Sequence, residues 1–151
     1  MNPEQEILEK WIERFNDSRL EPATALRWAQ PDPFRDPVGY TMRKGLSQLW
    51  GQLLGEMDPD IVDDALDRIL RIRAVQDVSP DKAVRFVADL RPLLDQLPSD
   101  LRRKVVEGRI DWLARAALDK YRQCRKQINV VRLHEAERLT GAHRAVRKVC
   151  L

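Results

Sequence analysis

The amino-acid sequence predicts an all-α fold, a compact bundle of about five to six helices with a long carboxy-terminal helix. Through most of the chain, apolar residues recur at the spacing of one helical face, and Asp-Pro or Ser-Pro pairs mark helix starts. No alternating strand pattern of convincing length is present. The 151 residues fit a single domain, because a chain of this length can bury a substantial core.

The expected helices follow one another with proline-rich breaks between them. The first helix carries an apolar face made of Ile7, Leu8, Trp11, Ile12 and Phe15. Pro22 can open a short second helix that runs through Trp28. Three further prolines then restrict the residues before them to extended conformations, so we expect a stiff loop over residues 30–38.

The next predicted helix covers residues 38–56 and contains three glycines. Glycine inside a helix costs about 1 kcal/mol relative to alanine, so its repeated use there indicates close approach of a neighbouring helix. These glycines are Gly45, Gly51 and Gly55.

Two later helices begin at Asp58-Pro59 and at Ser79-Pro80, where an N-cap residue precedes proline in the first turn. Pro92 is expected to kink or divide the second of them, because its ring clashes with a carbonyl of the preceding turn. After Ser99 no residue breaks the helical pattern until Gly141. This last helix is therefore the longest.

A row of residues in the last helix alternates steps of four and three, as in a coiled coil. We call these residues the seam: Ile110, Ala114, Ala117, Tyr121, Cys124, Ile128 and Val131. The pattern fits a core helix of the bundle, and it fits equally a helix that pairs in part with a second chain in a dimer. Glu135 and Arg138 occupy the next positions and end the apolar run.

The net charge of +3 hides a division along the chain. Residues 1–100 carry 13 lysines and arginines against 19 acids, whereas residues 101–151 carry 14 against 5. We therefore expect a core over about residues 5–125 and a basic helical extension over about residues 126–151. The basic extension can dock on the acidic body or meet an acidic partner.

The residue types that carry chemistry are scarce, so we expect neither an enzyme nor a cofactor or metal site. The two histidines, His134 and His143, are nine residues apart and fall on different sides of a helix. The two cysteines, Cys124 and Cys150, are expected to be reduced thiols. There is no Gly-rich phosphate loop, no signal peptide and no membrane-spanning run, so we expect a soluble, cytoplasmic protein.

Two segments are candidates for a functional role beyond folding: Asp32-Pro33-Phe34-Arg35-Asp36-Pro37-Val38-Gly39 and Arg71-Ile72-Arg73-Ala74-Val75-Gln76-Asp77. Arg73 lies near the apolar stripe of its helix, so we expect it to pair inside with an acid such as Asp77 or Asp36. We also expect Phe34 to pack against the helix that carries Arg73. The candidate ligand-binding or partner-binding residues are Phe34, Asp36, Pro37, Val38, Gly39, Arg71, Arg73, Gln76 and Asp77.

These two segments, with Gly45-Leu46 and Ser79-Pro80 between and after them, resemble the amino-terminal domain of RsbRD-type RsbT co-antagonists of the bacterial stressosome. The similarity spans roughly residues 5–125, and Asp36 departs from the asparagine expected there. The resemblance implies a helical sensory or regulatory domain with haem-free, globin-like, dimeric relatives. Because the sequence ends at Leu151, we expect a stand-alone form without the anti-sigma-factor-antagonist domain that follows in a full co-antagonist.

Together these observations predict a non-enzymatic signal-input or adaptor domain that acts through a protein partner and forms a homodimer through the seam. The alternative is a nucleic-acid-binding protein that uses its basic carboxy-terminal helix to neutralise phosphates. The absence of a nucleic-acid-binding motif and the spread of the basic residues around the helix weigh against the alternative.

Overall fold

The computed structural model describes residues 2–17, 34 and 36–150, with side chains described up to residue 140. This part of the chain contains helices and turns and no strand. The elements are α1 (Pro3–Asp17), α2 (Pro37–Leu54), α3 (Pro59–Val75), α4 (Pro80–Asp89), the 3-10 helix η2 (Arg91–Gln96) and α5 (Asp100–Cys150). The predicted all-α bundle with a long carboxy-terminal helix is confirmed.

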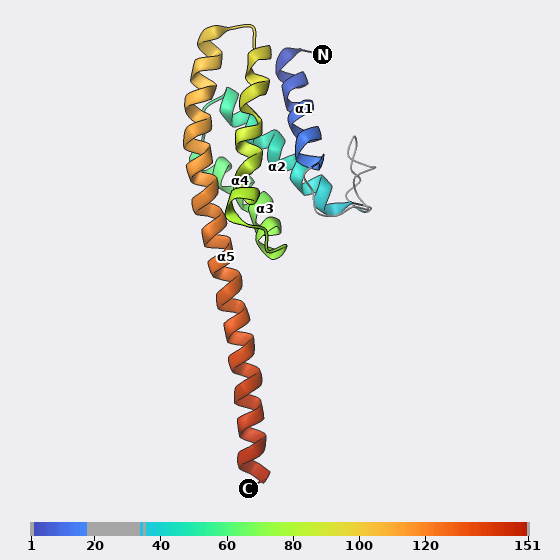
Figure 1. Cartoon of the computed structure of the whole chain (residues 1–151), viewed down its shortest axis with the longest axis vertical. Helices are drawn as coiled ribbons and strands as arrows, with labels where there is room; N and C mark the ends of the chain where they lie inside the picture. The colour runs from blue at the N-terminus through green and yellow to red at the C-terminus, as the bar shows by residue number, and fades with distance from the viewer. Residues whose placement is uncertain (1, 18–33, 35, 151) are drawn as a thin grey trace.

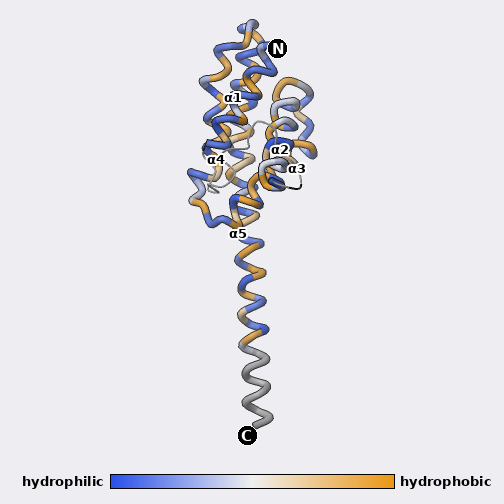
Figure 2. Tube along the Cα trace, turned by 90° about the vertical axis from the view of Figure 1, so that its right-hand side faces the viewer, coloured by the Kyte–Doolittle hydropathy of each residue, from blue (hydrophilic) through white to orange (hydrophobic). Residues whose placement is uncertain are grey.

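The molecule consists of a compact body and a projecting helix (Figure 1). The helices α1 to α4 and η2 pack beside the first half of α5, and the second half of α5 extends away from them. Figure 2 shows the same projection after a quarter turn. Every side chain from residue 129 to residue 140 is exposed. We call residues 129–150 the projecting segment.

The helix starts follow the capping pattern of the sequence. The Asp36 carboxylate accepts a hydrogen bond from the Gly39 N–H at 2.9 Å, and Asp58 accepts one from the Asp60 N–H at 3.0 Å. In both cases proline is the first helical residue. Ser79 occupies the cap position of α4, but its side chain makes no capping hydrogen bond.

One boundary differs from the prediction. The loop predicted over residues 30–38 ends earlier, since α2 already begins at Pro37, because proline fits the first turn of a helix. The helical extension predicted over about residues 126–151 agrees with α5, which continues through Gly141 to Cys150. One glycine costs about 1 kcal/mol and does not by itself end a helix. The predicted helix from Pro22 to Trp28 and most of the predicted loop lie outside the described residues.

The core of the body is one apolar cluster to which every described helix contributes. The helix α3 lies at its centre and makes its most extensive contacts with α5 and α2. Two indole N–H groups tie α1 to its neighbours. Trp11 donates to the Phe86 carbonyl at 2.7 Å, and Trp50 donates to the Glu4 carbonyl at 2.9 Å. The division by Pro92 is confirmed, because α4 ends at Asp89 and a 3-10 helix follows.

Gly45 is the glycine at which two helices approach closely. A Cβ atom at this position would lie 2.8 Å from Cγ1 of Ile69, which is buried in α3. At Gly51, by contrast, an added Cβ would meet no atom within 4 Å. The close-packing interpretation is therefore correct for Gly45 and wrong for Gly51, which faces solvent.

We predict opposite effects of alanine at these two glycines. Gly51→Ala should raise the free energy of unfolding by about 0.5–1 kcal/mol, because alanine loses less conformational entropy in a helix. Gly45→Ala should lower it by about 1 kcal/mol, because overlap with Ile69 outweighs that gain. Urea denaturation followed by circular dichroism measures both. Equal effects of the two variants would show that α2 and α3 do not approach closely at Gly45.

Candidate functional site

The carboxyl end of α3 holds α5 where α5 leaves the body. The Tyr121 hydroxyl donates a hydrogen bond to the Val78 carbonyl. Arg125 donates from Nη1 to the Ala74 carbonyl at 2.8 Å, and its Nη2 lies 2.6 Å from Oδ1 of Asp77. We call this group of contacts the latch. Its last member, Arg125, is four residues before the projecting segment begins.

Local chemistry explains why the end of α3 accepts an arginine. The Ala74 carbonyl lies in the last turn of α3 and accepts the Asp77 N–H at 3.2 Å. A carbonyl oxygen has two lone pairs, so it can also accept the Arg125 guanidinium. A cation is also favoured at this negative end of the helix dipole. Asp77 adopts a left-handed backbone conformation with φ of 61°, which ends the helix. Aspartate adopts this conformation with less steric strain than most other residues that carry a side chain.

The groups beside the latch have shifted proton affinities. Burial raises the pKa of Tyr121, which is 1% exposed, and the nearby Asp77 carboxylate raises it further, while Arg125 opposes the shift. Burial likewise raises the pKa of the Cys124 thiol, and Asp67 adds to the effect. Tyr121 and Cys124 are therefore neutral at physiological pH, which suits a packing role.

A groove of about 660 Å³ lies against the latch. One wall is the turn from Asp77 to Pro80, and the other is the α5 surface from Tyr121 to Leu133. Apolar side chains dominate its lining, with Arg122 and Lys126 beside them. A compound or segment that bound here would touch the body and the projecting segment together.

Arg71 and Arg73 have separate roles. Arg71 binds Asp67 one turn earlier in α3, with Nη2 2.8 Å and Nε 3.2 Å from the carboxylate oxygens. The hydrogen bond from Arg71 lowers the pKa of Asp67, against the opposing effect of burial. Arg73 is 4% exposed, and its guanidinium carbon lies 4.6 Å from the centre of the Phe15 ring. Asp77, one of the two expected partners of Arg73, pairs with Arg125 instead.

Phe15 is the residue that the sequence analysis missed at this position. The expectation that Phe34 packs against the helix with Arg73 is wrong, because the Phe34 side chain is 95% exposed. Phe15 is buried on the apolar face of α1 and contacts Phe86 edge to face, with 5.5 Å between the ring centres. The position of Phe15 on the apolar face of α1 predicted that it is buried. Nothing in the sequence predicted that α1 contacts Arg73.

The two family-like segments lie at the same end of a helical hairpin. A short turn joins α2 to α3, and Gly45 meets Ile69 between them, so the start of α2 lies near the end of α3. Asp36 and Gly39 are buried at that start, Val38 is partly buried and Pro37 is exposed. Gln76 is the C-cap residue of α3, and Asp77 follows it.

Most of the seam is covered by the protomer's own body. The residues that are no more than 1% exposed are Ile110, Ala117, Tyr121 and Cys124. Ala114 and Ile128 are partly buried, and Val131 is 59% exposed. The buried part of the seam therefore packs as a core helix, and only its end is available to a second chain.

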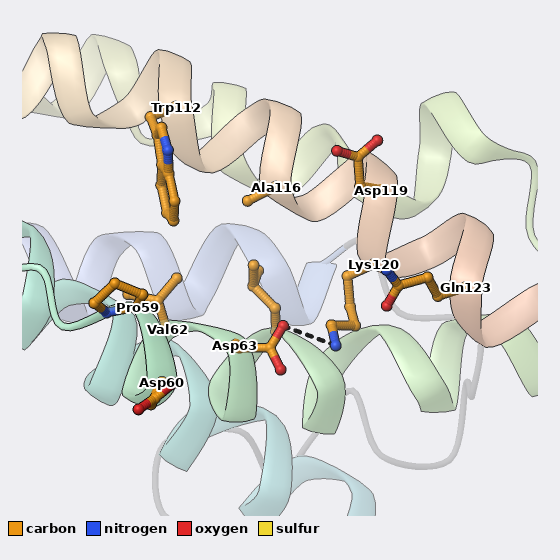
Figure 3. A pocket seen from close by; sticks show the side chains of 10 residues that line it. Pro59, Asp60, Val62, Asp63, Trp112, Ala116, Asp119, Lys120 and Gln123 are labelled. Atoms are coloured by element: carbon orange, nitrogen blue, oxygen red, sulfur yellow. Dashed lines mark ion pairs between the residues drawn. The ribbon is translucent and has the colours of Figure 1, made fainter.

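A second hollow, of about 390 Å³, lies between the start of α3 and the middle of α5 (Figure 3). The ring of Trp112 extends from α5 toward Pro59 and Val62, and it is 48% exposed. Lys120 bridges the two helices through an ion pair with Asp63 at 2.8 Å. The sequence analysis did not single out Trp112, although its position opposite the buried seam could have revealed it.

Two features are absent from the described residues. No three histidine, cysteine, aspartate or glutamate side chains gather there in a group that could hold a metal ion. No helix in the same part of the chain is long and apolar enough to cross a membrane.

The fold and the latch define a class of structure, an all-helical body that holds a projecting carboxy-terminal helix. The family model of the RsbT co-antagonist protein rsbRD N-terminal domain matches residues 5–138, and the chain belongs to this family. The match is longer than the similarity expected to end near residue 125, and it includes the latch and the first part of the projecting segment. No curated protein and no solved structure matches the chain.

We predict that Tyr121 ionises only above its ordinary pKa of 10.0, because burial disfavours the phenolate. The stability that this raised pKa contributes is fully present below the unfolded pKa and is lost as pH rises through the folded pKa. The tyrosinate absorbance of the wild type minus that of Tyr121→Phe isolates this group. A difference curve with its midpoint at or below pH 10 would show that Tyr121 is not buried in the latch.

Proposed function

We propose that this chain is a non-enzymatic signal-input or adaptor domain that acts in the cytoplasm through protein contacts. The latch is the observation that supports the proposal most strongly. It connects the end of α3, where one family-like segment lies, to the turn of α5 that carries Arg125. A ligand or partner that changes the end of α3 would thereby change how the projecting segment is held.

The proposed switch requires two states that a signal can distinguish, since a ligand shifts an equilibrium only by its difference in affinity for the two states. In the latched state, Arg125 contacts Ala74 and Asp77, as in this structure. In the second state Arg125 would leave Ala74 and Asp77, and the α5 turn at Tyr121 would loosen. The groove beside the latch is the site at which a ligand would favour one state, because both of its walls belong to elements that the latch joins.

The proposed output surface is the basic extension over residues 126–151. Val131 and Leu139 are 59% and 73% exposed on it, and basic residues such as Arg132 are exposed beside them. Apolar side chains next to cations suit an acidic protein surface with apolar patches. We further propose that the domain acts as a homodimer, as its relatives are expected to do.

The test of this function is capture of a protein partner by a tagged chain of residues 1–151. We predict that the wild type retains an acidic protein and that the double variant Arg132→Glu, Arg138→Glu loses it, because the variant reverses charge on the output surface. Lys104→Glu is the matched control, since Lys104 is exposed near the start of α5, 28 residues before Arg132 on the same helix.

Nucleic-acid binding is the outcome that would contradict the proposal. At about 0.15 M salt the Debye length is only ~8 Å, so scattered basic residues should leave oligonucleotide binding negligible. A titration of labelled single-stranded and duplex oligonucleotides with the same two variants measures this. Submicromolar binding that falls steeply with salt and disappears in the double variant would replace the adaptor proposal with a nucleic-acid-binding function.

A further inference from the structure

The groove beside the latch combines an apolar lining with two cations that no acid of the described residues neutralises. These cations are Arg122 and Lys126, which line the groove and are exposed. The third cation of the lining, Arg125, is paired with Asp77. The groove therefore presents an excess of positive charge to any molecule that occupies it.

The cations and the apolar residues of the α5 wall follow one another along one face of the helix. Arg122, Lys126, Asn129 and Leu133 are separated by steps of four, three and four residues. This spacing places their side chains on the same side of an α-helix. The two cations come first, and Leu133 comes last with Val130 beside it. At a rise of about 1.5 Å per residue, the wall changes from basic to apolar over about 16 Å.

The opposite wall adds apolar surface and a favourable dipole. Val78 and Pro80 line the groove from the start of α4. Between them lies Ser79, the cap residue of α4, whose side chain makes no capping hydrogen bond. The N–H groups at the start of an α-helix carry partial positive charge. This wall therefore also favours a ligand that combines negative charge with an apolar part.

The size of the groove suits a small molecule better than a folded protein. Its volume of about 660 Å³ lies within the range of about 300–1,000 Å³ that is usual for small-molecule sites. A stable protein interface covers about 800 Å² on each partner, which is a much wider surface. We therefore look for an occupant among small amphiphiles with an anionic group.

We propose that the groove binds a free fatty acid, an unbranched aliphatic tail with a carboxylate at one end. The carboxylate lies between Arg122 and Lys126, because it can accept hydrogen bonds from a guanidinium and an ammonium together. The tail runs between the α4 wall and the apolar end of the α5 wall. This inference rests on the proposed function, in which the groove receives the signal, and it adds the chemical class of the ligand.

A fatty acid in this position acts on the latch. It contacts the α4 wall and the α5 wall together, so its affinity is higher for the latched state than for a state in which the walls separate. The ligand therefore strengthens the connection that Arg125 makes between α3 and α5. Its effect on the protein is to hold the projecting segment in place relative to the body.

Calorimetric titration of the chain of residues 1–151 tests the apolar part of the site. The ligands are octanoate, decanoate and dodecanoate, each below the concentration at which it forms micelles. The dissociation constant should fall about fourfold for each two methylenes added, about half the free energy of full burial, because an open groove covers only part of the tail. Dodecylammonium has the same tail and the opposite charge, and it should bind at least about tenfold more weakly than dodecanoate. Equal binding of the two amphiphiles would overturn the proposal.

Charge reversal tests the position of the carboxylate. The double variant Arg122→Glu, Lys126→Glu should weaken dodecanoate binding about tenfold, because two attractive charges become repulsive. The matched control Lys104→Glu, Arg115→Glu reverses two exposed cations of α5 that do not line the groove, and it should bind as the wild type does. Circular dichroism checks that both variants keep the wild-type helicity. Unchanged affinity in the groove variant, or an equal loss in both variants, would show that the carboxylate does not lie at these cations.

Serine substitutions test the position of the tail. In Val130→Ser, Leu133→Ser the gain for each two methylenes should fall to about twofold, because one apolar wall is lost. In Val131→Ser, Leu139→Ser the fourfold gain should persist, because these residues are exposed but do not line the groove. The same chain-length dependence in both variants would contradict the proposed path of the tail.

Other results separate this inference from the proposed function. Wild-type binding to phosphatidylglycerol vesicles that is lost in Arg122→Glu, Lys126→Glu, with no binding of dodecanoate in solution, would assign the cations to a lipid surface and overturn the inference. A dimer by analytical ultracentrifugation that binds no dodecanoate would overturn it as well, because a second copy would then fill the groove. In both cases a captured protein partner would still support the proposed function. Dodecanoate binding without any captured partner would support this site and contradict the proposed function alone.

Discussion

The contact between Arg125 and the end of α3 is the interaction on which the rest of this structure depends. Before Arg125, α5 is a core helix whose inner face is covered by the body, and shortly after it the same helix projects alone. The boundary between these regions is the latch. In it, Tyr121 and Arg125 of α5 contact the carbonyls of Val78 and Ala74 and the carboxylate of Asp77. Anything that alters the end of α3 therefore acts where the projecting segment is anchored.

The apolar pattern of the sequence could predict the helices and most of the core, because burial follows directly from helical period. Trp11 and Phe15 illustrate this on α1, and Pro92 correctly marked a division. The seam was ambiguous for a physical reason. A helix packed against its own bundle and a helix paired with a second chain need the same spacing of apolar residues, so only the tertiary structure shows which partner covers Ile110.

The candidate site was predictable only in part. The sequence singled out the segment that ends at Asp77 as a candidate site. The ion-pair partner of Asp77 is Arg125, which follows 48 residues later, and charge alone cannot select it among the 27 lysines and arginines. Arg73 illustrates the same limit. Its burial was foreseen from the apolar stripe, whereas its contact with Phe15 depends on how α1 packs across the body. Long-range pairing of this kind is a property of the fold and leaves no local signal.

The most direct test of the account is the distance between the body and the projecting segment with the latch intact and broken. Nitroxide labels at Asp64→Cys and Leu139→Cys, in a Cys150→Ser background diluted with unlabelled chain, report this distance by pulsed electron resonance. The account predicts one narrow distribution that broadens in Arg125→Gln and stays narrow in Arg138→Gln, whose pair with Glu135 lies within the projecting segment. An unchanged distribution in Arg125→Gln would contradict the claim that the latch holds the projecting segment.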